Sequence, residues 1–211
     1  ADYSGMSLNI HPDFIRPYTL NANIKKYGFF SYTASEALYL SENEKETILG
    51  VFANIQNELK ERIDNFSQDV LISQIELLLN YSNRFYNRQF ITRKAVNNDV
   101  LSKLEILLED YFNNEKPLEN GLPTVQFVAD ELGLSARYLS DLLRNLSGQN
   151  TQQFIHDKLI EKAKEYITKG TFSMSEIAYK LGFEHPQSFN KLFKNKTNIS
   201  PIAFQEQFNK N

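Results

Sequence analysis

A predicted helix near the C-terminus carries polar and basic side chains along one side. Its apolar residues, Phe189, Leu192 and Phe193, recur at helical spacing and define the buried side. The opposite side presents Gln187, Ser188, Asn190, Lys191 and Lys194. These side chains offer hydrogen-bonding groups and positive charge, but they include neither a nucleophile with its base nor a pair of catalytic acids. The chemistry that this face offers is recognition of a polar, negatively charged partner.

A shorter helix must position this face. Ser173 and Glu176 form a capping-box pattern that begins a helix. Gly182 ends that helix, since glycine readily adopts positive φ. The helix that carries the polar face then begins near His185 or Pro186, because proline suits a first helical turn. A short helix, a glycine-containing turn and a second helix with a polar outer face are typical of a helix-turn-helix reader.

The same pattern occurs twice in the chain. Residues 128–134 match residues 177–183 at an offset of 49, with V-A-x-x-L-G-L against I-A-x-x-L-G-F. Beyond the turn the offset becomes 50, and the apolar positions 139, 142, 143 and 154 correspond to 189, 192, 193 and 204. An insertion in a turn is readily tolerated. Two copies in register are a stronger signal than one, and they predict a tandem helix-turn-helix unit.

The first copy has its own reading helix. Thr124 opens the leading helix, Ser135 caps the reading helix, and Gly148 ends it after about Leu146. Its outward side chains are Arg137, Ser140, Asp141 and Arg144. A long helix that starts at Asn150 or Thr151 and runs to about Thr168 joins the copies, and about 17 residues at about 1.5 Å each span roughly 26 Å. Such a rod could hold two reading helices about one turn of DNA, roughly 34 Å, apart.

This arrangement resembles the AraC/XylS family of bacterial transcription regulators. The second copy carries most of the resemblance through IAxxLGF, then Phe and Phe-Lys, then Ser-Pro-x-x-Phe ending at Phe204. The resemblance covers roughly residues 99–208, about half of the chain. It implies a sequence-specific regulator that reads two adjacent major-groove segments of double-stranded promoter DNA and that could contact RNA polymerase.

By position, the resemblance implies DNA contacts on both reading helices. Base contacts fall on Arg137, Ser140, Asp141, Gln187, Ser188, Asn190 and Lys191. Phosphate contacts fall on Arg144, Lys194 and Lys196, and on helix N-termini near Ser135, Ser173 and Ser200. Arg137 could read guanine, and Gln187 or Asn190 could read adenine. Asp141 is acidic where a basic or neutral residue is expected, so it could read cytosine or instead orient Arg137 or Arg144.

The formal net charge of −3 hides an uneven distribution. Residues 1–120 carry 12 basic and 17 acidic side chains, or −5, whereas residues 121–211 carry 11 and 9, or +2. Residues 190–198 contain three lysines and no acid. Because phosphate contacts are local, this placement matters more than the total charge.

Several classes of chemistry are not indicated. The chain has no Cys, which excludes disulfides, thiol catalysis and Cys-ligated metal and fits a reducing cytosol. His11, His156 and His185 lack partners at metal-ligand spacing, and no catalytic or cofactor motif is present. No segment reaches the roughly 20 apolar residues of a membrane helix, and the N-terminus lacks a signal-peptide pattern. We therefore expect a non-enzymatic, cytoplasmic protein without metal or cofactor.

The N-terminal part is predicted to hold a helical hairpin. Residues 1–40 are expected to be an irregular or strand-like remnant of an effector domain, because prolines and the aromatic run 27–32 disfavour helix. Relatives commonly carry a cupin-like barrel at this place. Residues 41–90 are predicted to form two helices, from Ser41 to about Asp64 and from about Ser67 to Arg88.

The second of these helices carries a heptad seam of the residues Leu71, Ile75, Leu78, Ser82 and Phe85. In the family the matching helices often form the dimer interface, so a homodimer through residues 41–90 is expected. The alternative is a purely intramolecular core against an effector barrel. Residues 91–97 are the predicted linker, and residues 98–209 the DNA-binding domain, with a first helix to about Asn113 and a loop over 114–123.

The expected fold is mainly α: a dimerisation-like hairpin followed by an all-α tandem helix-turn-helix domain. Two other classes of function compete with DNA reading. A protein-interaction module on the same scaffold predicts an apolar outer face, whereas residues 187, 188, 190 and 191 are polar. An enzyme with an appended reader, as in some alkyl-transfer repair proteins, would need the Cys nucleophile that the chain lacks.

Overall fold

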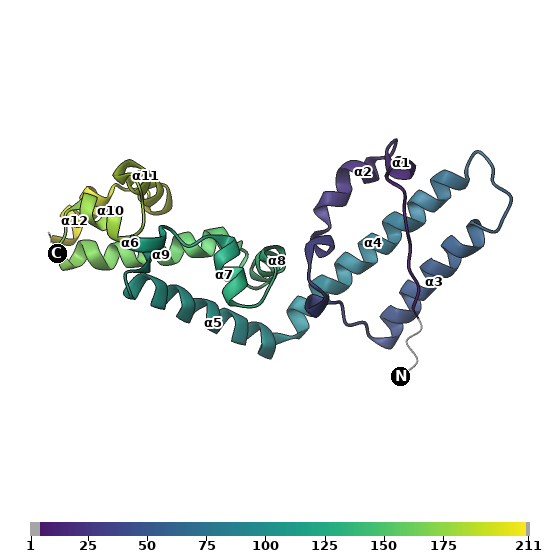
Figure 1. Ribbon diagram of the computed structural model, residues 1–211, viewed down its shortest axis with the longest axis horizontal. Helices are drawn as coiled ribbons and strands as arrows, with labels where there is room; N and C mark the ends of the chain where they lie inside the picture. Colours follow the sequence, from purple (N-terminus) through teal and green to yellow (C-terminus); the bar gives the residue numbers. More distant parts are fainter. Residues whose placement is uncertain (1–4, 210–211) are drawn as a thin grey trace. The chain divides into compact units, whose positions relative to one another are not determined.

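The computed structural model describes residues 5–209, which are helical with no strand (Figure 1). The mainly α fold predicted from the sequence is thereby confirmed. The chain divides into two compact units, residues 1–92 and 93–211. Each unit has its own apolar core, and the two are described separately.

A helical hairpin forms the first unit, with α3 (Glu42–Glu58) packed against α4 (Ser67–Thr92). Ser41 and Glu44 make the predicted capping box. The Glu44 carboxylate also receives the Arg88 guanidinium, with Nε 3.0 Å from Oε1, which ties the start of α3 to α4. The α3 helix ends six residues before the predicted Asp64, because the Asp64 carboxylate accepts the Phe66 and Ser67 N–H groups and forms the turn that begins α4.

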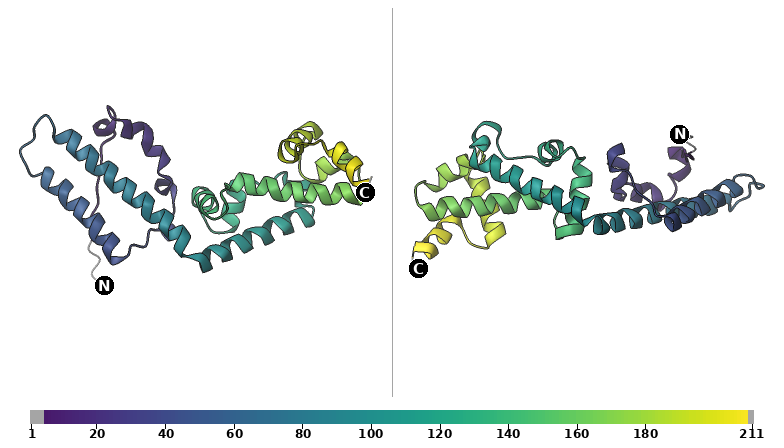
Figure 2. Two further views of the ribbon diagram at one scale, coloured as in Figure 1. Left: turned by 180° about the vertical axis from the view of Figure 1, so that it is seen from behind. Right: turned by 90° about the horizontal axis from the view of Figure 1, so that it is seen from below.

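The N-terminal segment folds as short helical turns rather than strands. It contains α1 (Pro12–Ile15), α2 (Thr19–Asn23) and the 3-10 turns Ile24–Lys26, Gly28–Ser31 and Ala34–Glu36. It lies along α4 in the views of Figures 1 and 2, held by the Tyr18–Asp69 and Tyr27–Asn80 hydrogen bonds of 2.5 and 2.9 Å. The strand-like alternative is therefore not found in residues 5–40, and residues 1–4 of that segment lie outside the described residues.

The predicted dimer seam lies inside this first core. Leu71, Ile75, Leu78 and Phe85 are at most 9% exposed, and the first three pack in the core cluster with Val51, Ile55 and the N-terminal turns. The half-buried Ser82 donates its hydroxyl hydrogen bond to the Leu78 carbonyl oxygen. A heptad stripe shows which side of a helix is covered but not by what. Here Leu71, Ile75 and Leu78 are covered within one chain, by α3 and the N-terminal turns.

The second unit consists of eight helices among the described residues. They are α5 (Lys94–Asn113), α6 (Lys116–Asn120), α7 (Val125–Glu131), α8 (Ala136–Ser147), α9 (Thr151–Lys169), α10 (Met174–Lys180), α11 (Pro186–Thr197) and α12 (Pro201–Asn209). Helices α4 and α5 extend into the predicted linker, so only Arg93 is non-helical between them. The short helix α6 occupies the predicted loop 114–123, where Pro117 suits a first turn.

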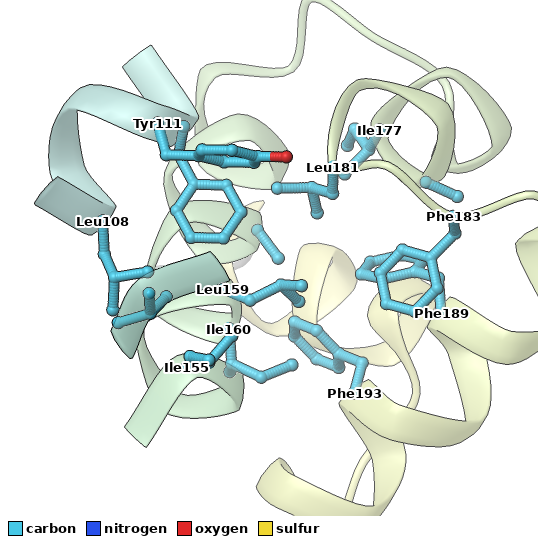
Figure 3. Packing of buried hydrophobic residues seen from close by; sticks show 14 of the residues in the cluster. Leu108, Tyr111, Ile155, Leu159, Ile160, Ile177, Leu181, Phe183, Phe189 and Phe193 are labelled. Carbon is cyan, nitrogen blue, oxygen red and sulfur yellow. The ribbon is translucent and has the colours of Figure 1, made fainter. Parts of the chain in front are cut away.

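Helix α9 is the centre of the second unit, and it contacts α5, α8, α10, α11 and α12. Ile155, Leu159 and Ile167 on α9 are at most 1% exposed. Figure 3 shows Ile155, Leu159 and Ile160 of α9 among core residues contributed by α5, α10 and α11. The helices α8 and α11 lie near opposite ends of α9 (Figures 1 and 2). One shared core thus supports both helix-turn-helix copies.

A close backbone contact joins the second copy to the segment before the first. Gly182 has φ +87°, and a Cβ there would lie 2.6 Å from the Gly121 carbonyl carbon and 2.9 Å from the Leu122 nitrogen. The Gly121 oxygen accepts a 3.0 Å hydrogen bond from the buried Tyr111 hydroxyl. Lys180 also reaches back to Glu115 across 2.8 Å. These contacts hold the turn of the second copy against the loop around Gly121.

Candidate nucleic-acid interface

The second reading helix, α11, is fixed by aromatic packing on one side. Phe189 and Phe193 are fully buried, and their rings lie 5.8 Å apart. Phe183 and Phe204 extend the stack at 5.6 and 5.7 Å. Pro186 begins the helix, and Asn198 ends it in the left-handed conformation at φ 65°. Burial of Phe189 and Phe193 fixes the orientation of α11 about its own axis, so the opposite side of the helix faces outward.

That outer face of α11 carries five exposed polar residues, Gln187, Ser188, Asn190, Lys191 and Lys194. Within residues 5–209 their side chains make no hydrogen bond, ion pair or ring contact. Two amides, a hydroxyl and two ammonium groups are therefore available to a ligand without breaking an internal contact. His185 precedes them at the N-cap position, where its side chain is exposed and makes no capping hydrogen bond.

Lys196, in the last turn of α11, has a different environment. Its ammonium group lies 2.5 Å from the Asp157 carboxylate on α9, and the other oxygen of that carboxylate accepts the Gln149 amide at 2.8 Å. A phosphate contact by Lys196 must compete with this ion pair. The neighbouring His156 has a pKa below its ordinary value because burial and the Lys196 charge disfavour the imidazolium, which Asp157 offsets in part.

The first reading helix, α8, is amphipathic in the predicted register. Ser135 caps it by accepting the Tyr138 N–H at 3.1 Å, and Gly148 ends it at φ 75°. Leu139, Leu142 and Leu143 are at most 1% exposed. Arg137, Ser140, Asp141 and Arg144 therefore lie away from the central apolar line, as the sequence predicts.

The polar side chains of α8 are engaged with one another and with α9. The Arg137 Nε lies 2.8 Å from one Asp141 oxygen, and an Arg144 terminal nitrogen lies 2.9 Å from the other. The Ser140 hydroxyl lies 3.0 Å from that of Thr151, which is fully buried at the start of α9. The two reading helices thus differ. The outward side chains of α8 form hydrogen bonds and ion pairs within the chain, whereas the five polar side chains on the outer face of α11 form none within residues 5–209.

The predicted phosphate contacts at helix N-termini use caps that already have partners. The hydroxyls of Ser135, Ser173 and Ser200 accept N–H groups of their own helices at 3.1, 3.3 and 3.1 Å. At α10 the Glu176 carboxylate also accepts the Ser173 N–H at 2.7 Å, and this hydrogen bond keeps the pKa of Glu176 below its ordinary value. A carboxylate at this N-terminus repels a phosphate.

Three features of the interface could not be read from sequence spacing: the Asp157–Lys196 pair, the Ser140–Thr151 pair and the Gly121–Gly182 contact. The first and last join residues more than 35 positions apart, and no local pattern marks them. The sequence does indicate the ion pairs of Asp141, because an acid three or four residues from an arginine on the same helix can pair with it.

The described part of the chain offers neither a metal-binding group of side chains nor a membrane-spanning helix. Residues 5–209 hold no group of three or more His, Asp or Glu side chains that could bind a metal ion. Within the same residues, no helix is long and apolar enough to cross a membrane. His11 caps α1 by accepting the Asp13 N–H at 3.3 Å.

Known proteins are similar to part of this chain. The sequence model of the helix-turn-helix domain matches residues 128–207. The chain is 30% identical over 136 residues to proteins of Salmonella paratyphi B and Salmonella newport, each named HTH-type transcriptional activator RhaS. These alignments cover 64% of this chain and 44% of each relative, so the chain spans less than half the length of those proteins.

Two solved structures are also similar to part of the chain. The C-terminal domain of the two-component response regulator yesN from Fusobacterium nucleatum is 24% identical, with a TM-score of 0.44, covering 51% of this chain and 98% of that one. A transcriptional regulator with an AraC-type DNA-binding domain from Chromobacterium violaceum is 20% identical, with a TM-score of 0.46, covering 54% and 96%.

Proposed function

We propose that this chain is a sequence-specific, DNA-binding regulator of transcription of the AraC type, because the helix-turn-helix domain model matches residues 128–207. The outer face of α11 is the observation that carries the proposal. It presents amide and ammonium groups outward on a rigid helix, and these groups have no internal partner within residues 5–209. They suit base edges in a major groove and the phosphates beside it.

The two reading helices would occupy successive major-groove segments. Helix α9 has 19 residues, and at about 1.5 Å per residue it spans roughly 28 Å, close to the roughly 34 Å of one DNA turn. Gln187, Ser188, Asn190 and Lys191 would contact bases from α11, and Arg137 from α8. The Ser140 hydroxyl already contacts Thr151, and the Lys196 ammonium group already pairs with Asp157, so their contributions should be smaller.

A protein-interaction module remains the competing function. It requires an apolar outer face on the reading helices, and the exposed residues of α11 argue against it. An enzyme is not supported, since the matched domain is a binding domain and the chain lacks the Cys of alkyl-transfer repair proteins.

Partners beyond DNA follow from the same proposal. A regulator bound at a promoter could contact RNA polymerase, and it would act in the cytoplasm where bacterial DNA lies. A homodimer through the first unit would use the outer side of α4, where Val70 and Leu77 are each 39% exposed, because the predicted seam is internal. The exposed Ile63 and Phe66 in the preceding turn would extend that surface.

To test the proposal, the full chain is used to select duplexes from a random-sequence pool, and its affinity for the selected duplexes is then measured at several salt concentrations. We expect a shared motif among selected duplexes. Replacing Asn190 or Arg137 by Ala should relax the preference at one base pair, by about 1–3 kcal/mol for a bidentate contact. Replacing Lys194 by Ala should weaken all duplexes alike and reduce the salt slope by about 1.

Lys60→Ala removes the same charge from the hairpin turn of the first unit and serves as a control that should leave both quantities unchanged. Selected duplexes without any common motif would refute specific recognition and would favour the interaction module.

A further inference from the structure

Asp141 occupies an unusual place for an acid, since it lies on the proposed DNA-reading face of α8. Its side chain is only 16% exposed, whereas those of Arg137 and Arg144 are 40% and 49% exposed. Each carboxylate oxygen accepts from a different arginine, at 2.8 and 2.9 Å. The acid is therefore flanked by two positive groups and partly covered by them.

This geometry argues against Asp141 as a base reader. Each carboxylate oxygen already accepts a charge-assisted hydrogen bond from a guanidinium, and the side chain is only 16% exposed, so the amino group of cytosine would have to share an oxygen atom with an arginine. The same bonds fix the positions of both arginines. The Arg137 guanidinium is held through Nε, which sets the plane in which its other nitrogen atoms lie.

The carboxylate also competes with DNA phosphates. A phosphate that approaches Arg137 or Arg144 meets the Asp141 charge next to the cation it would bind, and the like charges repel. Non-specific affinity depends on how many phosphates are neutralised by cations. An internal anion on α8 thus lowers non-specific affinity without removing the arginines.

We propose that Asp141 is a positioning residue that holds Arg137 and Arg144 and competes with backbone phosphates for them, so that α8 binds non-target DNA weakly. This inference rests on the proposed function as a DNA reader. The inference assigns different roles to α8 and α11. Lys191 and Lys194 of α11, which lack internal partners within residues 5–209, provide general attraction to DNA, and α8 contributes discrimination.

The test compares the wild-type chain with Asp141→Asn on a selected target duplex and on a scrambled duplex, across a range of salt concentrations. Releasing both arginines to phosphates should steepen the salt slope on the scrambled duplex by about 1 to 2, from roughly 0.9 per contact. Binding to the scrambled duplex at low salt should become several-fold tighter, and the ratio of target to scrambled affinity should fall.

Three variants make the result specific to Asp141. Asp141→Glu keeps the charge and should retain the wild-type slope. Arg137→Ala with Asp141→Asn should show only about half of the slope increase, because one released cation is missing. Asp99→Asn removes an acid of the same kind from an i,i+4 ion pair with Lys103 on α5, and it should change nothing.

Two outcomes would overturn the proposal. A changed base preference at one position with an unchanged slope would mean that Asp141 reads a base. A lower melting temperature with unchanged slope and preference would mean that the residue only stabilises α8. If the wild-type chain selects no motif, the proposed function fails separately, and the slope on scrambled DNA still tests whether Asp141 competes for the arginines.

Discussion

The Gly182 contact gives a sharp prediction about what holds the second helix-turn-helix copy in place. We expect Gly182→Ala to destabilise the second unit considerably more than Gly133→Ala. Both glycines follow the leading helix of a copy, and both have positive φ, +87° and +67°. They differ in their surroundings, because a Cβ at Gly133 meets nothing within 4 Å.

The magnitude follows from two separate costs. A non-glycine residue at positive φ costs about 1–2 kcal/mol, which both variants share. At Gly182 the new Cβ would also lie 2.6, 2.8 and 2.9 Å from backbone atoms of Gly121 and Leu122. That backbone is held by the Tyr111 hydroxyl, so making room requires displacement of a packed loop, which costs about 1–3 kcal/mol. We therefore expect a total of about 2–5 kcal/mol for Gly182→Ala and about 1–2 kcal/mol for Gly133→Ala.

Amide hydrogen exchange of the full chain is the suitable assay, because it resolves individual amides and so measures the stability of the second unit separately from that of the first. The slowest amides of α9, around Ile155 and Leu159, should measure the opening free energy of that core. The difference between the two variants isolates the contact with Gly121. Equal losses in both variants would refute the reasoning, because only positive φ would then matter.

Two further predictions concern the oligomer and acid stability. In light scattering, a dimer through α4 should have twice the chain mass of 24.5 kDa, and a wild-type mass of 24.5 kDa would exclude the dimer. Replacing the exposed Leu77 by Glu should reduce the mass to that of one chain without unfolding the protein, whereas replacing the buried Leu71 by Glu should unfold the hairpin. The lowered pKa of Glu176 means that its contribution to stability is complete above its unfolded pKa of about 4.5 and is lost as pH falls through the lower folded pKa. Urea unfolding should therefore show wild type more stable than Glu176→Gln at pH 7, with a difference that shrinks by pH 3; a difference independent of pH would contradict this account.

Local chemistry explains why much of the second unit could be predicted. The Ser135 and Ser173 caps and the Gly148 turn each depend on residues within three or four positions, so sequence alone locates these helix ends. The short helix α6 was missed because Pro117 and Gly121 together are typical of a loop, although Pro117 here begins a helical turn.

Tertiary contacts explain what could not be predicted. The spacing of Leu71, Ile75 and Leu78 predicts an apolar, covered stripe, but it does not indicate that α3 and the N-terminal turns cover this stripe. Likewise, side chains on the outer face of α8 could be named, but the contact between Ser140 and Thr151 depends on how α9 begins. Hydrophobic periodicity predicts which side of a helix a side chain lies on, but it does not predict which residue that side chain contacts.

The shared helix α9 has a consequence for how this architecture can change. Both copies are attached to one continuous helix, so a residue inserted in its middle would turn the second copy by about 100° relative to the first and move it by only about 1.5 Å. Small changes in the length of α9 would therefore misalign the two outer faces rather than adjust their separation. Only insertions near a whole number of turns would restore the alignment, which makes the spacing between the two faces change in steps.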